Sequence, residues 1–136
     1  AGAIGFALMS YLNATLVPGI DLVIKETGIE NKIKDADLVL TGEGRLDGQS
    51  YMGKVPVGIA SLAKKYNKPV VAFAGCVTDD ASLCNDYGID AFFPILRTPC
   101  TLEEAMDCEN AYKNLKDTTV QVMKLINAKI ILEANK

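Results

Sequence analysis

A polar, glycine-rich stretch carries the side chains of this chain that are best suited to chemistry. Its charged members are Glu43, Arg45 and Asp47, and Lys54 closes the stretch. A carboxylate can act as a general base or bind a metal ion, whereas arginine and lysine bind phosphate or carboxylate groups. The residue types leave a structural alternative equally open, in which Asp47 caps the loop and Arg45 pairs with Glu43.

Small and polar residues surround these charges, and glycines among them would let backbone N–H groups approach an anion closely. These residues are Gly42, Gly44, Gly48, Gln49, Ser50 and Gly53. The spacing from Gly48 to Lys54 matches G-x-x-x-x-G-K, but Val55 stands where a P-loop needs Ser or Thr. The match also begins six residues after Gly42 instead of directly after the strand. We therefore favour a milder reading, in which glycines and a lysine at a helix N-terminus hold a phosphate.

A dinucleotide-binding fingerprint is the second glycine pattern to consider. Gly42 and Gly44 have its first spacing, but Gly48 comes one residue too late for G-x-G-x-x-G. Two glycines in a loop are weak evidence, so this pattern does not indicate NAD binding.

The stretch is expected to follow a buried parallel strand. The run from Leu38 to Leu40 is wholly apolar, as is typical of a strand covered on both faces, and Thr41-Gly42 ends it. Ligands of α/β proteins bind beyond the carboxyl ends of such strands, and this position favours a functional role for the loop. Asp79 and Asp80 follow the second strand at the same rim, where we interpret them as helix caps.

The other elements alternate along the chain. Apolar patterning predicts strands at 37–41, 70–74 and 91–96, and helices at 1–12, 18–27, 29–34, 54–66 and 80–87. A single long helix, with a kink near Cys108, is expected after the capping box formed by Thr101 and Glu104. Pro94 argues that the third strand lies at an edge or ends early.

This alternation predicts one α/β domain over residues 1–136, in which a helical lead-in at 1–35 precedes a β-α-β-α-β-α part at 36–136. Right-handed crossovers would give a three-layer α/β/α arrangement around a small parallel sheet. Three strands are few for this architecture, so pairing partners are expected outside the chain. A chain that begins with Ala1 in place of Met also suggests a fragment of a longer protein.

Composition argues against several classes of protein. The net charge is −3 and the basic residues are scattered, so we expect neither a nucleic-acid partner nor a membrane surface. No apolar run approaches the roughly 20 residues of a membrane span, and no signal peptide is visible, which favours a cytoplasmic location. Four cysteines without a C-x-x-C pair, and the lack of any histidine, argue against zinc.

The polar stretch resembles the bacterial glycerate kinases, including the type that forms 2-phosphoglycerate. The residues that carry the resemblance are Asp37–Asp47, Gln49-Ser50, Gly53–Ala60, Lys68–Val71, Ala74-Gly75, Thr78–Asp80, Gly88–Asp90 and Thr101–Ala105, with Gly5–Leu8 and Pro18–Ile20 upstream. The core T-G-E-G-R-x-D-x-Q-S is specific, and the similarity covers nearly the whole chain. It concerns the C-terminal part of longer, two-domain proteins, whose N-terminal Asp-Ser-Phe-Lys-Gly type motif is absent here. Ala3 also stands where a glycine is usual.

The resemblance implies a Rossmann-like domain and an ATP-dependent, Mg²⁺-assisted phosphorylation of D-glycerate, with 2-phosphoglycerate as the favoured product. It places Asp47 near the substrate hydroxyl or Mg²⁺, and Arg45 and Lys54 near phosphate or carboxylate groups. Gln49, Ser50 and the glycines at 42, 44 and 53 would contribute to substrate or phosphate binding. The motif does not decide whether Glu43 or Asp47 is the base.

The resemblance also bears on partners. The N-terminal part of the same chain is an expected partner, and a homo-oligomer is possible. Without that part the isolated chain is expected to be inactive. The alternative is a non-catalytic module of the same fold that binds a small acid or a nucleotide.

Overall fold

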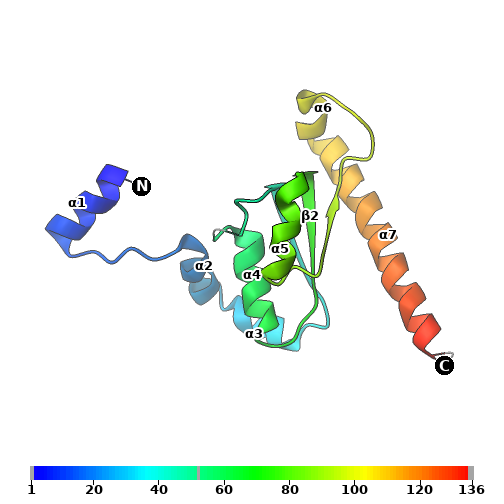
Figure 1. The fold of residues 1–136 in the computed structure, drawn as a ribbon, viewed down its shortest axis with the longest axis horizontal. Coiled ribbons are helices and arrows are strands. Elements are labelled where there is room, and N and C mark those ends of the chain that lie inside the picture. Colours follow the sequence, from blue (N-terminus) through cyan, green and yellow to red (C-terminus); the bar gives the residue numbers. More distant parts are fainter. Residues whose placement is uncertain (1, 52, 135–136) are drawn as a thin grey trace.

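A three-stranded parallel sheet forms the centre of the molecule (Figure 1). The computed structural model describes residues 2–51 and 53–134. The strands are β1 (Val39–Leu46), β2 (Val70–Val77) and β3 (Ala91–Pro94), in the order β1-β2-β3. All pairs are parallel, so the predicted α/β fold with a small parallel sheet is confirmed.

The first strand is longer than predicted, and this changes the position of the glycine-rich residues. We expected a loop from Gly42 onward, but β1 continues to Leu46 and pairs with an equally extended β2. Gly42 lies opposite Phe73, and Arg45 lies opposite Cys76. The prediction was wrong because pairing with β2 satisfies the backbone groups of this stretch, and this outweighs the local preference of glycine for loops.

The third strand is shorter than predicted. It ends at Pro94, which lies opposite Ala74, and the next residue, Ile95, still donates its N–H to the Ala74 carbonyl at 2.8 Å. Proline lacks a backbone N–H and is tolerated at a sheet edge. The edge position inferred from Pro94 is therefore confirmed.

One face of the sheet carries most of the helices and the larger core (Figure 1). These helices are α2 (Gly19–Thr27), α3 (Ile29–Asp35), α4 (Val55–Lys64), the 3-10 turn η1 (Asp79–Ser82) and α5 (Leu83–Asp86). The α4 helix buries Ile59, Ala60 and Ala63, whose spacing places them on one side of the helix. The predicted helix at 80–87 is thus divided between η1 and α5.

The opposite face is covered by α7 (Cys108–Ala134), preceded by α6 (Leu102–Met106). Thr101 and Glu104 form the predicted capping box. The single kinked helix was wrong, since Asp107 is extended and accepts the N–H of Asn110 at 2.9 Å, which starts a new helix. Helices on both faces of the sheet confirm the three-layer arrangement.

The first helix, α1 (Gly2–Leu12), stands apart from the sheet at the end of an extended connection (Figure 1). Its apolar side chains are exposed, with Phe6 at 71% and Tyr11 at 85%. Pro18 precedes α2 as its N-cap residue and does not belong to the first helical turn. Among the described helices, none is both long enough and apolar enough to cross a bilayer.

Candidate functional site

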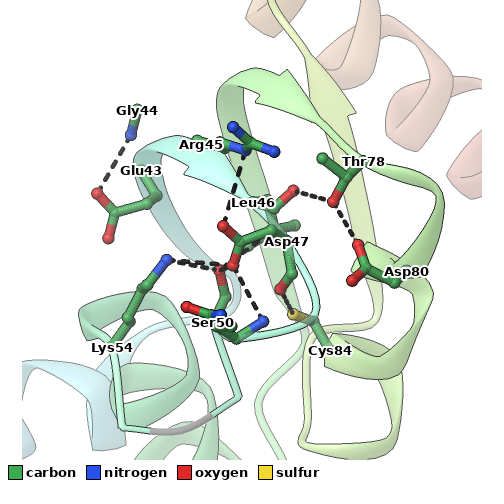
Figure 2. Close-up of polar contacts among 11 residues, drawn as sticks. Glu43, Gly44, Arg45, Leu46, Asp47, Ser50, Lys54, Thr78, Asp80 and Cys84 are labelled. Atoms are coloured by element: carbon green, nitrogen blue, oxygen red, sulfur yellow. Dashed lines mark hydrogen bonds and ion pairs between the residues drawn. The ribbon is translucent and has the colours of Figure 1, made fainter.

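Asp47 lies at the carboxyl end of β1 and is the centre of a compact polar cluster (Figure 2). Its Oδ1 accepts the N–H of Gln49 at 3.0 Å and the hydroxyl of Ser50 at 3.1 Å. Lys54 donates from Nζ to the same oxygen at 3.2 Å. Asp47 therefore closes a turn through its side chain and also forms an ion pair with the first residue before α4.

Ser50 holds this turn together from inside. It is fully buried, its Oγ accepts the N–H of Asp47 at 3.1 Å, and its N–H bonds the Asp47 carbonyl at 2.9 Å. Lys54 approaches the same Oγ at 3.4 Å. A buried hydroxyl that is both donor and acceptor fixes the orientation of the Asp47 carboxylate.

The electrostatic surroundings keep Asp47 ionised. The hydrogen bond from the Lys54 ammonium lowers the pKa of Asp47, partial burial opposes this, and the Ser50 hydroxyl and Gln49 N–H lower the pKa further. A carboxylate held in this way is a weak proton acceptor at neutral pH. It is well suited to bind a cation or to accept a hydrogen bond from a hydroxyl group.

Arg45 and Glu43 both belong to β1 but have different partners. Arg45 places Nε at 3.7 Å from Asp47 Oδ2, with 65% of its side chain exposed. Glu43 accepts the N–H of Gly44 at 3.2 Å, and among the described residues it forms no ion pair with Arg45. The structural alternative that paired Arg45 with Glu43 is therefore wrong, whereas its other part, a turn capped by Asp47, is correct.

Lys54 stands at the N-terminal end of α4. It is the N-cap residue in an extended conformation, and Gly53 before it has φ +93°, a value that favours glycine. The first N–H groups of a ten-residue helix point towards this end, where an anion is stabilised. Gly53 and Lys54 thus lie at a helix N-terminus, as predicted, and phosphate binding there stays a prediction.

Glu43, Gly53 and Lys54 share the lining of a cavity of about 690 Å³ along the open edge of β1. Its other walls are mostly apolar and come mainly from α2, α3 and β1, with Thr27, Lys32 and Thr41 as polar members. A second cavity of about 480 Å³ lies on the α7 side of β1, where Gly42 and Glu43 meet Phe73. Glu43 lines both cavities, whereas Asp47 lines neither.

The glycines predicted to approach an anion divide into two groups. Gly42 and Gly44 are strand residues, and Gly44 meets Gly75 so closely that a Cβ on Gly75 would lie 2.7 Å from the Gly44 carbonyl oxygen. Gly53 and Gly48 belong to the connection between β1 and α4. With Gly42 and Gly44 inside a strand, the dinucleotide fingerprint is not formed, because that motif needs glycines at a strand-to-helix turn. The G-x-x-x-x-G-K match begins two residues after the strand, and Val55 still occupies the Ser or Thr position.

The residues present fit Mg²⁺ and the phosphates of a nucleotide. Among the described residues no three acidic, cysteine or histidine side chains converge on one point. Mg²⁺ does not need such a cage, because it commonly uses one or two carboxylates together with water and phosphate oxygens. Oδ2 of Asp47 faces away from the turn contacts, and the Arg45 and Lys54 cations beside it suit phosphate.

Sequence reasoning did not place Asp80, Thr78 and Cys84 against this turn. Asp80 was interpreted as a helix cap, but the Thr78 hydroxyl donates to the Asp80 carboxylate, and neither Thr78 nor Asp79 caps a helix through its side chain. Buried Cys84 directs its Sγ towards the Asp47 carbonyl at 3.9 Å. One sequence signal could have indicated the contact: these residues follow β2, Asp47 follows β1, and the carboxyl ends of parallel strands lie at the same edge of the sheet.

Comparison with known proteins identifies related sequences over nearly the whole chain. The glycerate kinase family model matches residues 1–127. The chain is 49% identical over 115 residues to glycerate 2-kinase of Escherichia coli K12, covering 85% of this chain and 30% of that protein. It is 40% identical over 126 residues to a glycerate kinase of Haemophilus influenzae, covering 93% and 33% respectively.

A solved structure shows the same fold. It comes from Salmonella typhimurium LT2 and is provisionally described as a glycerate kinase 2. The TM-score is 0.69 at 42% sequence identity, over 94% of this chain and 31% of that one. The chain thus spans about a third of the length of the proteins it matches.

Proposed function

The chain belongs to the glycerate kinase family, and from this premise we propose that it supplies one wall of a site where ATP phosphorylates D-glycerate. The observation that carries the proposal is the Asp47 cluster. It brings a carboxylate, Lys54 and Arg45 together beyond the carboxyl end of a parallel strand.

The roles of the charged groups follow from phosphoryl transfer as a reaction. Its transition state is loose, and catalysis depends on positioning and on neutralising charge more than on a strong base. A carboxylate with a lowered pKa can therefore serve, since Asp47 needs only to orient the acceptor hydroxyl or hold Mg²⁺. ATP would supply the phosphoryl group, and Mg²⁺ would neutralise its phosphate oxygens.

The cations have complementary roles. Lys54 at the start of α4 would hold phosphate together with the first N–H groups of the helix. Arg45 is largely exposed and can turn from Asp47 towards a phosphate or the carboxylate of glycerate. Transfer to the C2 hydroxyl, giving 2-phosphoglycerate, is the favoured outcome.

The chain by itself is expected to fold without phosphorylating glycerate. Phosphoryl transfer needs donor, metal and acceptor together, and a misplacement of about 1 Å can reduce the rate about 100-fold. Lys54 of the Asp47 cluster lines the cavity beside β1, and β1 pairs with β2 alone among the described residues. The test is a coupled ADP-release assay with D-glycerate and Mg-ATP, in which Escherichia coli glycerate 2-kinase is the positive control. Turnover by the chain at the rate of that enzyme would contradict the expectation.

A chimaeric kinase tests the function itself. In it, this chain replaces the matching stretch of Escherichia coli glycerate 2-kinase. We expect glycerate-dependent ADP release, and proton-coupled ³¹P spectra of the product should show a phosphate ester coupled to a single carbon-bound proton, as on C2. If the chimaera folds and binds Mg-ATP but does not turn over with glycerate, the chain is a binding module without chemistry.

A further inference from the structure

The turn that carries Asp47 rests on the segment that follows β2. The Thr78 N–H donates to the Leu46 carbonyl at 3.1 Å, which extends the pairing of β1 and β2 by one step. Asp47 follows β1 directly, and Asp80 stands three residues after the end of β2. The two segments therefore leave the sheet side by side (Figure 2).

Asp80 touches the turn at Gly48. A Cβ on Gly48 would lie 2.2 Å from Asp80 Oδ2 and 2.7 Å from its Cγ, so only glycine fits here while the carboxylate stays in place. The carboxylate is held on its other side by the Thr78 hydroxyl. Hydrogen bonds from Thr78 and from the Gly48 N–H lower the pKa of Asp80, which agrees with a carboxylate fixed between the two.

Two further contacts join the same segments. Cys84 is fully buried, with its Sγ directed at the Asp47 carbonyl. Tyr51 stacks on Tyr87 with ring centroids 5.0 Å apart and planes inclined by 17°. Contacts at positions 47, 48 and 51 give the turn a continuous support from η1 and α5.

We propose that Asp80 is a positioning residue that holds Gly48 in place and thereby aims the Asp47 carboxylate at Lys54. Only the expected effect of Asp80 on turnover rests on the proposed function; the contact between Asp80 and Gly48 does not. Asp80 forms no ion pair with Lys54 or Arg45 among the described residues, and it packs against the turn at Gly48. The Asp47 carboxylate also acts on Asp80 directly through its charge, which raises the pKa of Asp80 and so opposes the lowering by its hydrogen bonds.

A double-mutant cycle on the chain itself tests the contact. Gly48→Ala introduces the clash, and an overpacking cost of about 1.4 kcal/mol corresponds to about tenfold faster opening of the turn. We expect the amides of Gln49 and Ser50 to exchange about tenfold faster, while the Phe73 amide in β2 keeps its rate. In the Asp80→Ala background, Gly48→Ala should have a clearly smaller effect, because the nearest remaining side-chain atom lies 3.2 Å away and has to shift by only a few tenths of an ångström.

The matched control is Asp79→Ala, which removes the same charge from the adjacent exposed residue. Gly48→Ala should still accelerate exchange in that background. Equal acceleration with and without the Asp80→Ala substitution, or none in either case, would overturn the proposal. If Gly48→Ala does not fold, Thr78→Val takes its place. It removes the hydroxyl contacts with Asp80 and with the Leu46 carbonyl, so part of the acceleration of Ser50 exchange should disappear in the Asp80→Ala background. The same acceleration in both backgrounds would overturn the proposal.

The consequence for catalysis is measured separately in the chimaeric kinase. Gly48→Ala and Asp80→Ala should each lower kcat more than they change KM. The double variant should lose less than the product of the two separate fold-losses, because the clash and the support involve the same contact. The two proposals can fail separately. If the exchange rates show coupling between positions 48 and 80 but the chimaera has no glycerate-dependent turnover, the proposed function is rejected and the positioning role stands. If the chimaera is active but the effects of Gly48→Ala and Asp80→Ala on kcat are independent of each other, only the positioning role is rejected.

Discussion

At the scale of single residues, Asp47 combines two tasks that usually compete. Oδ1 closes the turn by accepting from Gln49, Ser50 and Lys54, while Oδ2 faces Arg45 at 3.7 Å. The first oxygen therefore maintains the geometry, and the second is the one suited to a ligand. A substitution that removes the charge but keeps an oxygen acceptor can therefore be distinguished from one that also breaks the turn.

The first prediction at this scale concerns activity. In the chimaeric kinase, Asp47→Asn should lower kcat by at least about 100-fold, as expected for a positioned acid–base or metal-binding group. The amide can still accept from Gln49 through its oxygen, so the protein should remain folded. Steady-state kinetics and circular dichroism measure both quantities. Near-normal turnover would return Asp47 to a purely structural role.

The second prediction concerns pH. The folded-state pKa of Asp47 is lowered, so its contribution to stability is present above the usual aspartate value of about 3.9 and is lost as the pH falls through the folded-state value. Urea denaturation should show Asp47→Asn to be less stable than the parent near neutral pH, with the difference shrinking in acid. Asp79→Asn is the control, because it removes the same charge. If its stability difference from the parent depends on pH as strongly as that of Asp47→Asn, the stabilising role assigned to the Asp47 carboxylate is contradicted.

At the scale of elements, the length of β1 depends on close approach between two strands. Gly75 in β2 faces the carbonyl oxygen of Gly44, and the pairing continues past this point to Leu46 and Val77. Gly75 permits the extended ladder that brings Arg45 and Asp47 to the sheet rim, so its main role in the structure is strand packing. A Cβ on Gly44 would meet no atom within 4 Å, so the packing does not require glycine there.

This leads to a graded pair of substitutions. Gly75→Ala should destabilise the chain by about 1–3 kcal/mol, because its Cβ would lie 2.7 Å from a backbone oxygen that cannot rotate away. Gly44→Ala meets no atom within 4 Å and should change the free energy of unfolding by less than about 0.5 kcal/mol. Urea denaturation measures both values, and equal effects would contradict the packing role.

At the scale of the whole molecule, the two faces of the sheet are unequally covered. The face under α2, α3, α4 and α5 has a large buried core, whereas the face under α7 has a small one. On that second face Val122 of α7 is buried against Val71 and Phe73, and Ile126 is partly buried beside them. The α7 helix should therefore open at lower cost than the central strand.

Hydrogen exchange checks this expectation. Val122→Ala removes two buried methyl groups, worth roughly 1–2 kcal/mol, and should speed exchange throughout α7 while leaving β2 amides almost unchanged. Val120→Ala, at a position that is 43% exposed, is the matched control and should have little effect. If β2 accelerates together with α7, the two form one cooperative unit.

Much of this fold was accessible from sequence because local patterns carry it. Alternating apolar runs predicted three parallel strands and helices between them, and Pro94 indicated an edge strand. The capping box at Thr101 needs only neighbouring residues and was also predicted correctly. The similarity to glycerate kinases depended on one polar stretch of unusual composition, and the family was confirmed.

What the sequence left open depended on contacts between distant residues. The glycines at 42 and 44 were expected in a loop, and pairing with β2 placed them in a strand. Only the tertiary structure paired Arg45 with Asp47 and brought Asp80 against Gly48. Local propensity describes what a segment prefers in isolation, whereas backbone pairing and side-chain contact are decided by the segment that folds beside it.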